Sequence, residues 1–378
     1  MTLMSSAADL HFIPEVLFGR GVLERVGPAA RGYGRRALLV TDRGMRSTGI
    51  VDQVVALLAA AGVDAVIFDG VRPNPTIDNV EAGLAAGSGA EIGILVSVGG
   101  GSAHDCAKMI ALVAANGGEV HEFEGMDRSP HRALPMIAVN TTSGSGADVS
   151  RFAVITDERR KIKMIIADKH LVPRLSINDP LTTVGLPASI TMASGLDALT
   201  HAIEAYVSTS ASEITDLLAL RAVELAGLHL RNAVRNGANL EAREGIMLAS
   251  LLAGLAINSA SVGAVHALAH QLGGRYDLAH GVCNGILLPV VVEFNLGATP
   301  DRYDRLARAL GRGGGRSLPA SLRALGKEVG LPPSLGPLGV RQADLSGLAD
   351  QALLDMCMAT NPRRMTHSDV VKLYERAL

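Results

Sequence analysis

The amino-acid sequence predicts an α/β domain built on a parallel sheet, followed by an all-α domain. A chain of 378 residues is too long for one ordinary hydrophobic core, which favours two domains. In the first half, short β-rich apolar runs alternate with helical patterns. From Pro187 onward strand signals disappear, and long Ala- and Leu-rich helical segments follow. We therefore place the first domain at residues 1–183 and the second at residues 184–378.

The alternation in the first half is typical of parallel βαβ units whose sheet is covered by helices on both faces. Ligands of such sheets bind at the carboxyl ends of the strands, so the loops that follow the strands are the first candidates for function. The predicted strands, with the small-residue loops that two of them enter, cover residues 36–42, 64–70, 92–102 and 134–146, and the predicted helices cover 50–62 and 79–90.

The second half is predicted to consist of helices separated by three stretches rich in residues that favour turns. These stretches read RNGANLE, YDLAHGV and GRGGGRS. The apolar stretch 245–265 is interrupted by Asn258 and by several serines. We interpret it as a buried helix rather than a membrane span, which needs roughly 18 uninterrupted apolar residues.

Composition excludes several classes of function. The chain has 35 basic and 37 acidic residues and a net charge of −2, which argues against a nucleic-acid or membrane-surface partner. The three cysteines, Cys106, Cys283 and Cys357, are far apart and form no Cys-x-x-Cys pair. The N-terminus lacks the basic and apolar regions of a secretory signal. These features together favour a cytoplasmic protein with reduced thiols.

A glycine-rich loop follows the strand predicted at 92–102. Gly99, Gly100, Gly101 and Ser102 stand between this strand and a helix. Glycines let backbone N–H groups approach a phosphate, and a helix N-terminus adds free donors and positive potential. Asp105 in the first helical turn is favoured by the same potential. The pattern is neither G-x-G-x-x-G nor a P-loop, so alone it is equally compatible with a tight turn.

A second loop at the same edge of the sheet favours a dinucleotide. The stretch NTTSGSG, which includes Thr141 and Thr142, follows the next strand and is rich in hydroxyl groups. Asp42 ends the first predicted strand, where a carboxylate accepts hydrogen bonds from a ribose and repels a 2′-phosphate; a helix N-cap is the alternative. Lys163 is interpreted either as a phosphate ligand or as a solvated lysine at a strand edge.

A carboxylate and several histidines form a candidate metal site. Asp197 and His201 are four residues apart, on one face of a predicted helix. Further along, His266, His270 and His280 follow an H-x3-H-x9-H pattern. Imidazole and carboxylate suit Fe(II), Zn, Co or Ni better than Mg or Ca. Spacing alone would pair His266 with His270, and it leaves open which three histidines bind; hydrogen-bonded core histidines remain the alternative.

Four motifs carry a resemblance to a known family. The stretches GGGSAHDCAK, NTTSGSG, DALTHAIEAYVS and HALAHQLGGRYDLAHGVCNGILLP resemble the iron-dependent (group III, iron-containing) alcohol dehydrogenases, over essentially the whole chain. The resemblance implies a Rossmann-like dinucleotide-binding domain and a helical metal-binding domain, in the dehydroquinate synthase-like fold. It also implies that Asp197, His201, His266 and His280 are the metal ligands and that His270 lies near the nicotinamide.

The resemblance also assigns cofactor and substrate contacts. Asp42 matches the position that favours NAD over NADP, and Cys357 matches a position in the substrate pocket, to which we also expect residues 258–262 to contribute. Asn140 stands where many members of the family have Pro. The other positions that match cofactor contacts of the family are Asn74, Gly99, Gly100, Gly101, Ser102, Thr141, Thr142 and Lys163. We add Asp105, in the first turn of the following helix, to the predicted cofactor contacts.

The implied function is an NAD-dependent alcohol dehydrogenase that interconverts a short primary alcohol and its aldehyde. Fe(II), or Zn or another divalent metal, would activate the alcohol oxygen, and His270 would relay its proton to solvent. Glu204, one turn after His201, is interpreted as a structural residue. The alternatives are a lyase similar to dehydroquinate synthase, a zinc polyol dehydrogenase similar to glycerol dehydrogenase, a lactaldehyde or hydroxy-aldehyde reductase, and a non-enzymatic NAD or metal sensor. We expect a homo-oligomer.

Overall fold

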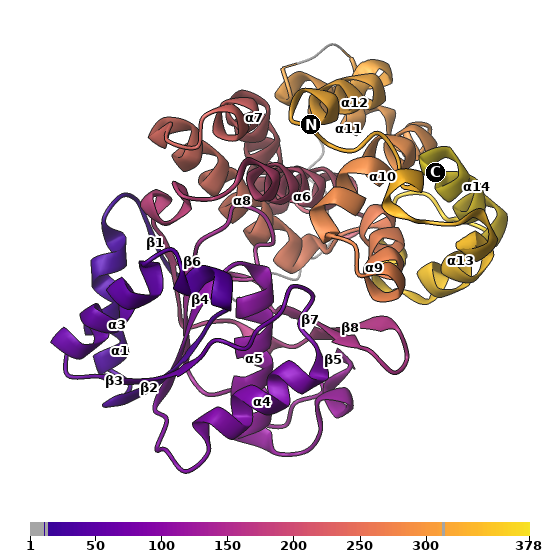
Figure 1. Ribbon diagram of the computed structural model, residues 1–378. Coiled ribbons are helices and arrows are strands. Elements are labelled where there is room, and N and C mark those ends of the chain that lie inside the picture. The colour runs from indigo at the N-terminus through magenta and orange to yellow at the C-terminus, as the bar shows by residue number, and fades with distance from the viewer. Residues whose placement is uncertain (1–10, 12–13, 312–313) are drawn as a thin grey trace.

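Strands and helices separate along the chain. The computed structural model describes residue 11, residues 14–311 and residues 314–378. The prediction that the chain has no secretory signal rests mostly on N-terminal residues that lie outside the described residues. Two residues of the GRGGGRS stretch also lie outside them. The strands gather in the half coloured indigo to magenta in Figure 1, and the other half is helical. The predicted succession of an α/β and a helical part is confirmed.

The main sheet has six strands, and every neighbouring pair in it is parallel. The carboxyl ends of all six strands therefore lie along one edge, as the sequence predicts. In spatial order, the strands are β1 (Glu15–Phe18), β9 (Leu175–Asn178), β6 (Met136–Asn140), β4 (Ile94–Gly99), β2 (Arg36–Val40) and β3 (Asp64–Phe68).

Helices cover both faces of this sheet, so its central strands are buried on both sides. Alternate residues of β4 face opposite cores: Leu95 packs in the core that contains Met109, and Val96 packs in the core that contains Val54. This double burial explains why the central strands are almost continuously apolar. The helices of this half are α1 (Val26–Arg31), α2 (Arg43–Arg46), α3 (Ile50–Ala60), α4 (Ile77–Gly87) and α5 (Gly101–Asn116).

A second, smaller sheet was not among the predicted elements. An antiparallel hairpin joins β7 (Phe152–Asp157) to β8 (Ile162–Ala167), and the two-residue strand β5 (Gly125–Met126) pairs with β8. Helix α9 (Ala264–Tyr276) of the helical half packs against β8. The hairpin therefore extends the α/β half toward the helices and brings Lys163 with it.

The helical half has one continuous apolar core, to which its longest helices all contribute. All described strands end before it, at or before Asn178. The helices are α6 (Ala188–Val207), α7 (Glu213–Arg235), α8 (Leu240–Ala260), α9 (Ala264–Tyr276), α10 (His280–Asn295), α11 (Pro300–Ala309), α12 (Leu318–Glu328), α13 (Leu345–Leu354) and α14 (His367–Ala377).

The apolar stretch 245–265 forms most of α8 and the turn into α9, and it is largely buried. Within the described part of the chain, no single helix has both the length and the apolar character that crossing a bilayer requires. Taken together, α8 and α9 reach that length and composition, but they are bent by 102° where they meet.

Close helix packing brings the candidate ligands together. Helix α10 lies so near α6 that a Cβ on Gly281 would overlap the carbonyl oxygen of Ala193. Because His280 is the first residue of α10 and Asp197 lies one turn beyond Ala193 on α6, this approach sets their separation. The turn between α9 and α10 begins at Asp277, which has a left-handed backbone (φ 54°).

We predict that Gly254→Ala lowers the melting temperature. A Cβ at this position of α8 would lie 2.8 Å from the Cα of Gly146 and 2.8 Å from Cγ2 of Val149. Overpacking of this kind typically costs about 1–3 kcal/mol. Gly347→Ala in α13, where nothing lies within 4 Å, is the control, and it should keep or raise the melting temperature. Equal melting by circular dichroism for both variants would contradict the tight contact.

Candidate active site

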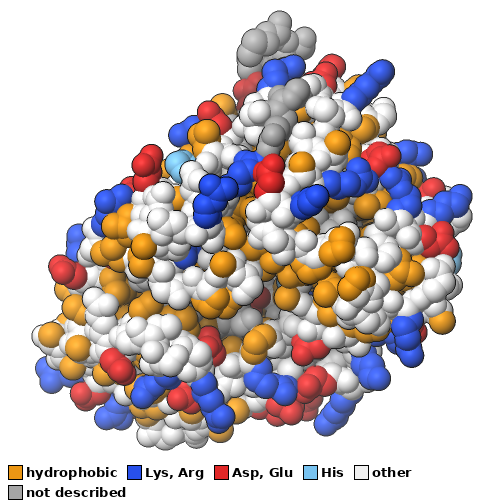
Figure 2. Space-filling model, turned by 45° about the horizontal axis from the view of Figure 1, so that its top comes forward, with side chains coloured by type: hydrophobic (Ala, Val, Ile, Leu, Met, Phe, Trp, Pro, Cys, Tyr) orange, Lys and Arg blue, Asp and Glu red, His pale blue; other side chains and the backbone are white. Residues whose placement is uncertain are grey.

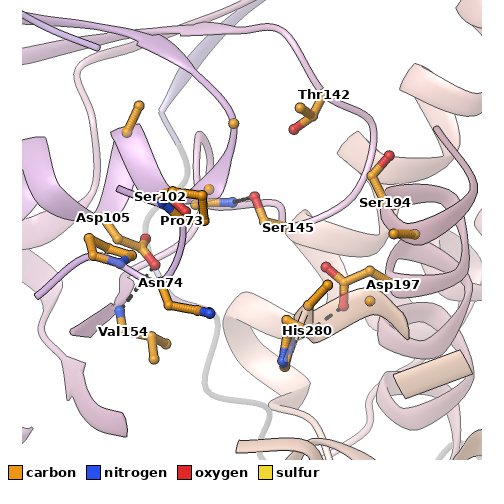
Figure 3. Close-up of a pocket in the computed structure, with 18 of the residues that line it drawn as sticks. Pro73, Asn74, Ser102, Asp105, Thr142, Ser145, Val154, Ser194, Asp197 and His280 are labelled. Carbon is orange, nitrogen blue, oxygen red and sulfur yellow. Dashed lines mark hydrogen bonds and ion pairs between the residues drawn. The ribbon is translucent and has the colours of Figure 1, made fainter. Parts of the chain in front are cut away.

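One large cavity lies between the sheet edge and the helical half. Its volume is about 1070 Å³, and it is lined from both sides. Figure 3 shows Asn74, Ser102 and Asp105 on the sheet side and Asp197 and His280 on the helical side. The predicted site residues that line it are Asp42, Asn74, Gly100, Gly101, Ser102, Asp105, Thr142, Lys163, Asp197, His201, His266, His270 and His280.

The two predicted cofactor loops touch each other. A Cβ on Gly100 would lie 2.7 Å from Thr142 Oγ1, and a Cβ on Gly101 would lie 2.9 Å from Ser145 Oγ. The loops can pack this closely because these two residues are glycines. Gly100 is the N-cap of α5 and offers no side-chain acceptor, so the first turn of α5 keeps free N–H donors of the kind that bind phosphate.

Asn140 fixes the base of the second loop. Its Nδ2 donates to Asn178 Oδ1 (3.0 Å), and its Oδ1 accepts the N–H of Thr142 (3.3 Å). Gly99 and Thr141, also predicted as cofactor contacts, do not line the cavity. They connect the ends of β4 and β6, where the N–H of Thr141 donates to the carbonyl of Gly99 (3.0 Å).

Asp42 caps a helix and also lines the cavity. Its Oδ1 accepts the N–H of Met45 (2.9 Å) and so caps α2, and the residue also lines the cavity beside Gly44. Asp105 lines the cavity too and accepts the N–H of Val154 (3.1 Å). Burial raises the pKa of Asp105 to about 6, although Lys108 works in the opposite direction.

A chain of hydrogen bonds joins the two halves at the cavity. Lys163 Nζ donates to Asn74 Oδ1 (2.8 Å), and Asn74 Nδ2 donates to Asp277 Oδ1 (2.6 Å). Asn74 has a left-handed backbone (φ 53°), as Asp277 does. Burial lowers the pKa of Lys163. Lys163 is therefore hydrogen-bonded at the cavity, and both of its sequence interpretations stay predictions.

Three histidines surround the Asp197 carboxylate. The Nε2 atoms of His280, His266 and His201 lie 3.6, 3.7 and 4.0 Å from Asp197 Oδ1. The rings of His201 and His266 are stacked, with centroids 4.5 Å apart. Asp197, His201 and His266 are buried. Helices α6, α9 and α10 therefore deliver one oxygen and three nitrogens to one point.

Two of these histidines are held by Nδ1. His201 Nδ1 lies 3.2 Å from the carbonyl oxygen of Gly144, and His266 Nδ1 lies 2.5 Å from Glu204 Oε2. Because a carbonyl or carboxylate oxygen only accepts, each Nδ1 donates, which leaves Nε2 for coordination. The residues present thus fit a divalent metal, since three imidazole nitrogens and one carboxylate oxygen suit Fe(II) or Zn.

The ionisation of the cluster also bears on metal binding. Burial works to raise the pKa of Asp197, but the histidines, His201 and His280 foremost, outweigh it and hold that pKa below its usual range. Burial lowers the pKa of His201 to about 4, although Asp197 opposes this. Burial also works to lower the pKa of His266, but Glu204 and Asp197 outweigh it and raise that pKa to about 9. At neutral pH the metal-free cluster therefore contains an ionised carboxylate, a neutral His201 and a proton on His266 that a bound metal would displace.

Asn284 is a neighbour of this cluster that the sequence analysis missed. Its Nδ2 donates to Asp197 Oδ1 (2.7 Å) and lies 3.2 and 3.1 Å from Nε2 of His266 and His280. Its Oδ1 has no hydrogen-bond partner among the described residues. Its position four residues after His280, on the same helix face, was the available signal.

His270 belongs to a different contact group. Its Nδ1 donates to Asp355 Oδ2 (2.9 Å), and Asp355 Oδ1 accepts the N–H of Cys357 (2.9 Å). The structure therefore gives no support to the pairing of His266 with His270 that spacing favours. Glu204 and Asp355 were not predicted as functional, because neither is near its histidine partner in the sequence.

Apolar side chains line the cavity near the histidines. Ser261 and Val262, from the expected segment 258–262, lie in the lining together with Cys357, Phe152 and Ile257. The outer surface, in contrast to the cavity lining, carries many charged side chains. In the face shown in Figure 2, Lys and Arg are interspersed with Asp and Glu and do not form a patch of one charge. The cavity lining thus combines these apolar side chains with the polar cluster.

Comparisons with known proteins identify the family. Residues 14–180 match the model described as iron-containing alcohol dehydrogenase, and residues 191–378 match the one described as Fe-containing alcohol dehydrogenase family, C-terminal. The chain is 46% identical over 374 residues to alcohol dehydrogenase 4 of Schizosaccharomyces pombe, covering 97% of this chain and 88% of that one. It is 42% identical to the 1,3-propanediol dehydrogenase of Klebsiella pneumoniae, covering 97% and 98%.

A solved structure agrees with the sequence relatives. The crystal structure of a 1,3-propanediol oxidoreductase superposes with a TM-score of 0.96 at 40% identity, covering 99% of this chain and all of that one. The predicted family, fold and class of enzyme are confirmed. This chain belongs to the iron-containing alcohol dehydrogenase family.

Proposed function

We propose that the protein oxidises a short primary alcohol to its aldehyde with NAD, and catalyses the reverse reaction, at a divalent metal bound by Asp197, His201, His266 and His280. One observation carries the proposal: a single cavity joins the two glycine- and hydroxyl-rich loops to the cluster of one carboxylate and three histidines. A hydride transfer needs the cofactor and the alcohol side by side, and this cavity provides both places.

The chain's residues have separate tasks. When bound, the metal supplies Lewis acidity to the alcohol oxygen and NAD accepts the hydride. The free N–H groups at the start of α5, with Ser102 and Thr142, bind the phosphates, and Asp42 binds the adenosine ribose. Lys163 and Asn74 hold the nicotinamide half of the cofactor near α9. His270, buried in the same cavity, carries the alcohol proton away.

Related proteins support the substrate class. Besides the relatives above, an NAD-dependent methanol dehydrogenase of Bacillus methanolicus is 39% identical and a lactaldehyde reductase of Escherichia coli is 37% identical to this chain. Ile257, Val262 and Cys357 give the region near the histidines an apolar character, which suits the short alkyl part of such an alcohol. Reduction of lactaldehyde or a similar hydroxy-aldehyde stays the second candidate.

Three further expectations stay predictions. We propose that the two domains meet between residues 183 and 184, in the connection from β9 to α6. Free, buried thiols at all three cysteines support a reducing, cytoplasmic environment. Large apolar side chains exposed on α7, such as Leu217 and Leu228, support a homo-oligomer.

A substrate panel tests the proposal. Protein of measured metal content is supplied with NAD and methanol, ethanol, butanol, 1,3-propanediol, glycerol or 1,2-propanediol, and NADH is followed by its absorbance. We expect NADH formation, with the largest kcat/KM for a short primary alcohol. A lyase of the dehydroquinate synthase type would form no net NADH, a polyol dehydrogenase would prefer glycerol, and a sensor would bind NAD without turnover.

Two histidine variants separate metal binding from catalysis. We predict that His280→Ala loses both bound metal and activity, because one of four ligands is gone. The matched variant is His270→Ala, since the His270 ring is stacked on that of His280 at 5.4 Å; it should lose activity and keep its metal. Metal content is measured by elemental analysis. Stoichiometric metal in His280→Ala would overturn the ligand assignment.

The cofactor assignment predicts that Asp42→Gly shifts preference toward NADP. Removal of the carboxylate abolishes its repulsion of a 2′-phosphate and its hydrogen bond to the ribose, so the ratio of kcat/KM for NADP to that for NAD should rise roughly tenfold or more. Loss of the cap on α2 should cost only a few tenths of a kcal/mol, because Gly is tolerated at N-caps. An unchanged ratio would show that Asp42 does not contact the ribose.

A further inference from the structure

Glu204 is a buried carboxylate to which the proposed function assigns no role. It lies on α6, one turn after His201, and is 4% exposed. In the described parts of the chain it forms no ion pair with Lys or Arg; its ion pair is with His266. A buried carboxylate is costly unless its oxygens are hydrogen-bonded, so the groups that it binds must explain its presence.

Both oxygens of Glu204 bind the first turn of α9. Oε2 accepts from His266 Nδ1 (2.5 Å), and Oε1 accepts from the N–H of Val265 (2.6 Å). The N-cap of α9 is Gly263, which has no side-chain acceptor of its own, and a Cβ there would lie 2.9 Å from Glu204 Oε1. The carboxylate thus replaces the missing cap and fixes the ring of His266 at the same time.

The two contacts together determine which nitrogen of His266 faces the cluster. Since Glu204 Oε2 accepts from Nδ1, Nε2 is the nitrogen left for the metal, and it lies 3.7 Å from Asp197 Oδ1. Ligating histidines commonly carry such a carboxylate on their second nitrogen, and it fixes both tautomer and ring orientation. Resting on the function proposed above, we propose that Glu204 is a positioning residue that orients His266 for metal binding.

Asp355 provides an internal comparison. It too is a buried carboxylate that accepts from a histidine Nδ1 with one oxygen, on His270, and from a backbone N–H with the other, on Cys357. Asp355 Oδ2 also accepts from Gln271 Nε2 (3.3 Å). The pattern otherwise matches that of Glu204, but its histidine is not a proposed ligand. Loss of either carboxylate should therefore cost a similar amount of fold stability, whereas only Glu204 should affect the metal.

The test compares Glu204→Gln with Asp355→Asn. A glutamine has one acceptor and one donor group at its end, so it cannot accept from both Val265 and His266. If its amide N–H₂ faces His266, the imidazole proton moves to Nε2 and blocks coordination; if its oxygen faces His266, two donors meet at Val265. We expect Zn(II) and Co(II) to bind the metal-free Glu204→Gln protein about 10- to 100-fold more weakly, as measured by competition with a chelator.

The matched variant and a spectroscopic signal complete the test. Asp355→Asn should keep wild-type metal affinity and the wild-type visible spectrum of bound Co(II), whereas Glu204→Gln should alter that spectrum because His266 is turned or lost as a ligand. Equal metal affinities in the two variants would overturn the proposal and leave Glu204 as a helix cap alone. If Glu204→Gln does not fold, Glu204→Asp replaces it: this variant keeps two acceptors but retracts them, so unchanged affinity would likewise overturn the proposal.

Failure of this inference is distinct from failure of the proposed function. If His280→Ala loses its metal while Glu204→Gln binds metal as tightly as the wild type, the ligand set holds and only the role of Glu204 fails. If His280→Ala keeps its metal, the ligand set itself fails, whatever the affinity of Glu204→Gln.

Discussion

The buried, ionised carboxylate of Asp197 is the constraint on which the helical half depends. Removing such a charge from water costs several kcal/mol unless opposite charge or donors surround it. Here His201, His266 and His280 approach it from three helices, and Asn284 donates to it. The helices must therefore converge at this point, and the small side chain of Gly281, which lets α10 approach α6, is part of the same requirement.

The α/β half meets a different requirement, because it must present backbone donors at one edge of a sheet. Parallel strands place the loops after β4 and β6 together, and glycines at 100 and 101 let the loops touch without excluding a ligand. Gly144, in the second loop, also contributes the carbonyl that binds His201 Nδ1. One loop thus serves both halves: it packs against the loop that begins α5 on one side and orients His201, a proposed metal ligand, on the other.

Sequence patterns predicted the alternation of strands and helices and both loops, because each depends on neighbours in the chain. They also indicated a cluster of one carboxylate with histidines, because these residue types recur in two segments of the helical half. Spacing could not decide whether His270 or His280 completes the cluster. Helix periodicity favours the pair His266 and His270, four residues apart, whereas the tertiary fold brings His280 to Asp197. The family resemblance supplied the choice of His280. The roles of Glu204 and Asp355 could not be predicted from spacing, because their histidine partners are 62 and 85 residues away. The β7–β8 hairpin, which places Lys163 at the cavity, was missed as well.

The chain of hydrogen bonds from Lys163 through Asn74 to Asp277 has a consequence for the order of events in turnover. Asn74 lines the cofactor side of the cavity, and Asp277 begins the short turn that ends at His280. If the two halves separated to exchange a nucleotide, the hydrogen bond between Asn74 and Asp277 would break, and the turn that leads to His280, a proposed metal ligand, would lose that contact. A nucleotide and a metal that both favoured the joined form would then raise each other's binding affinity by the same factor.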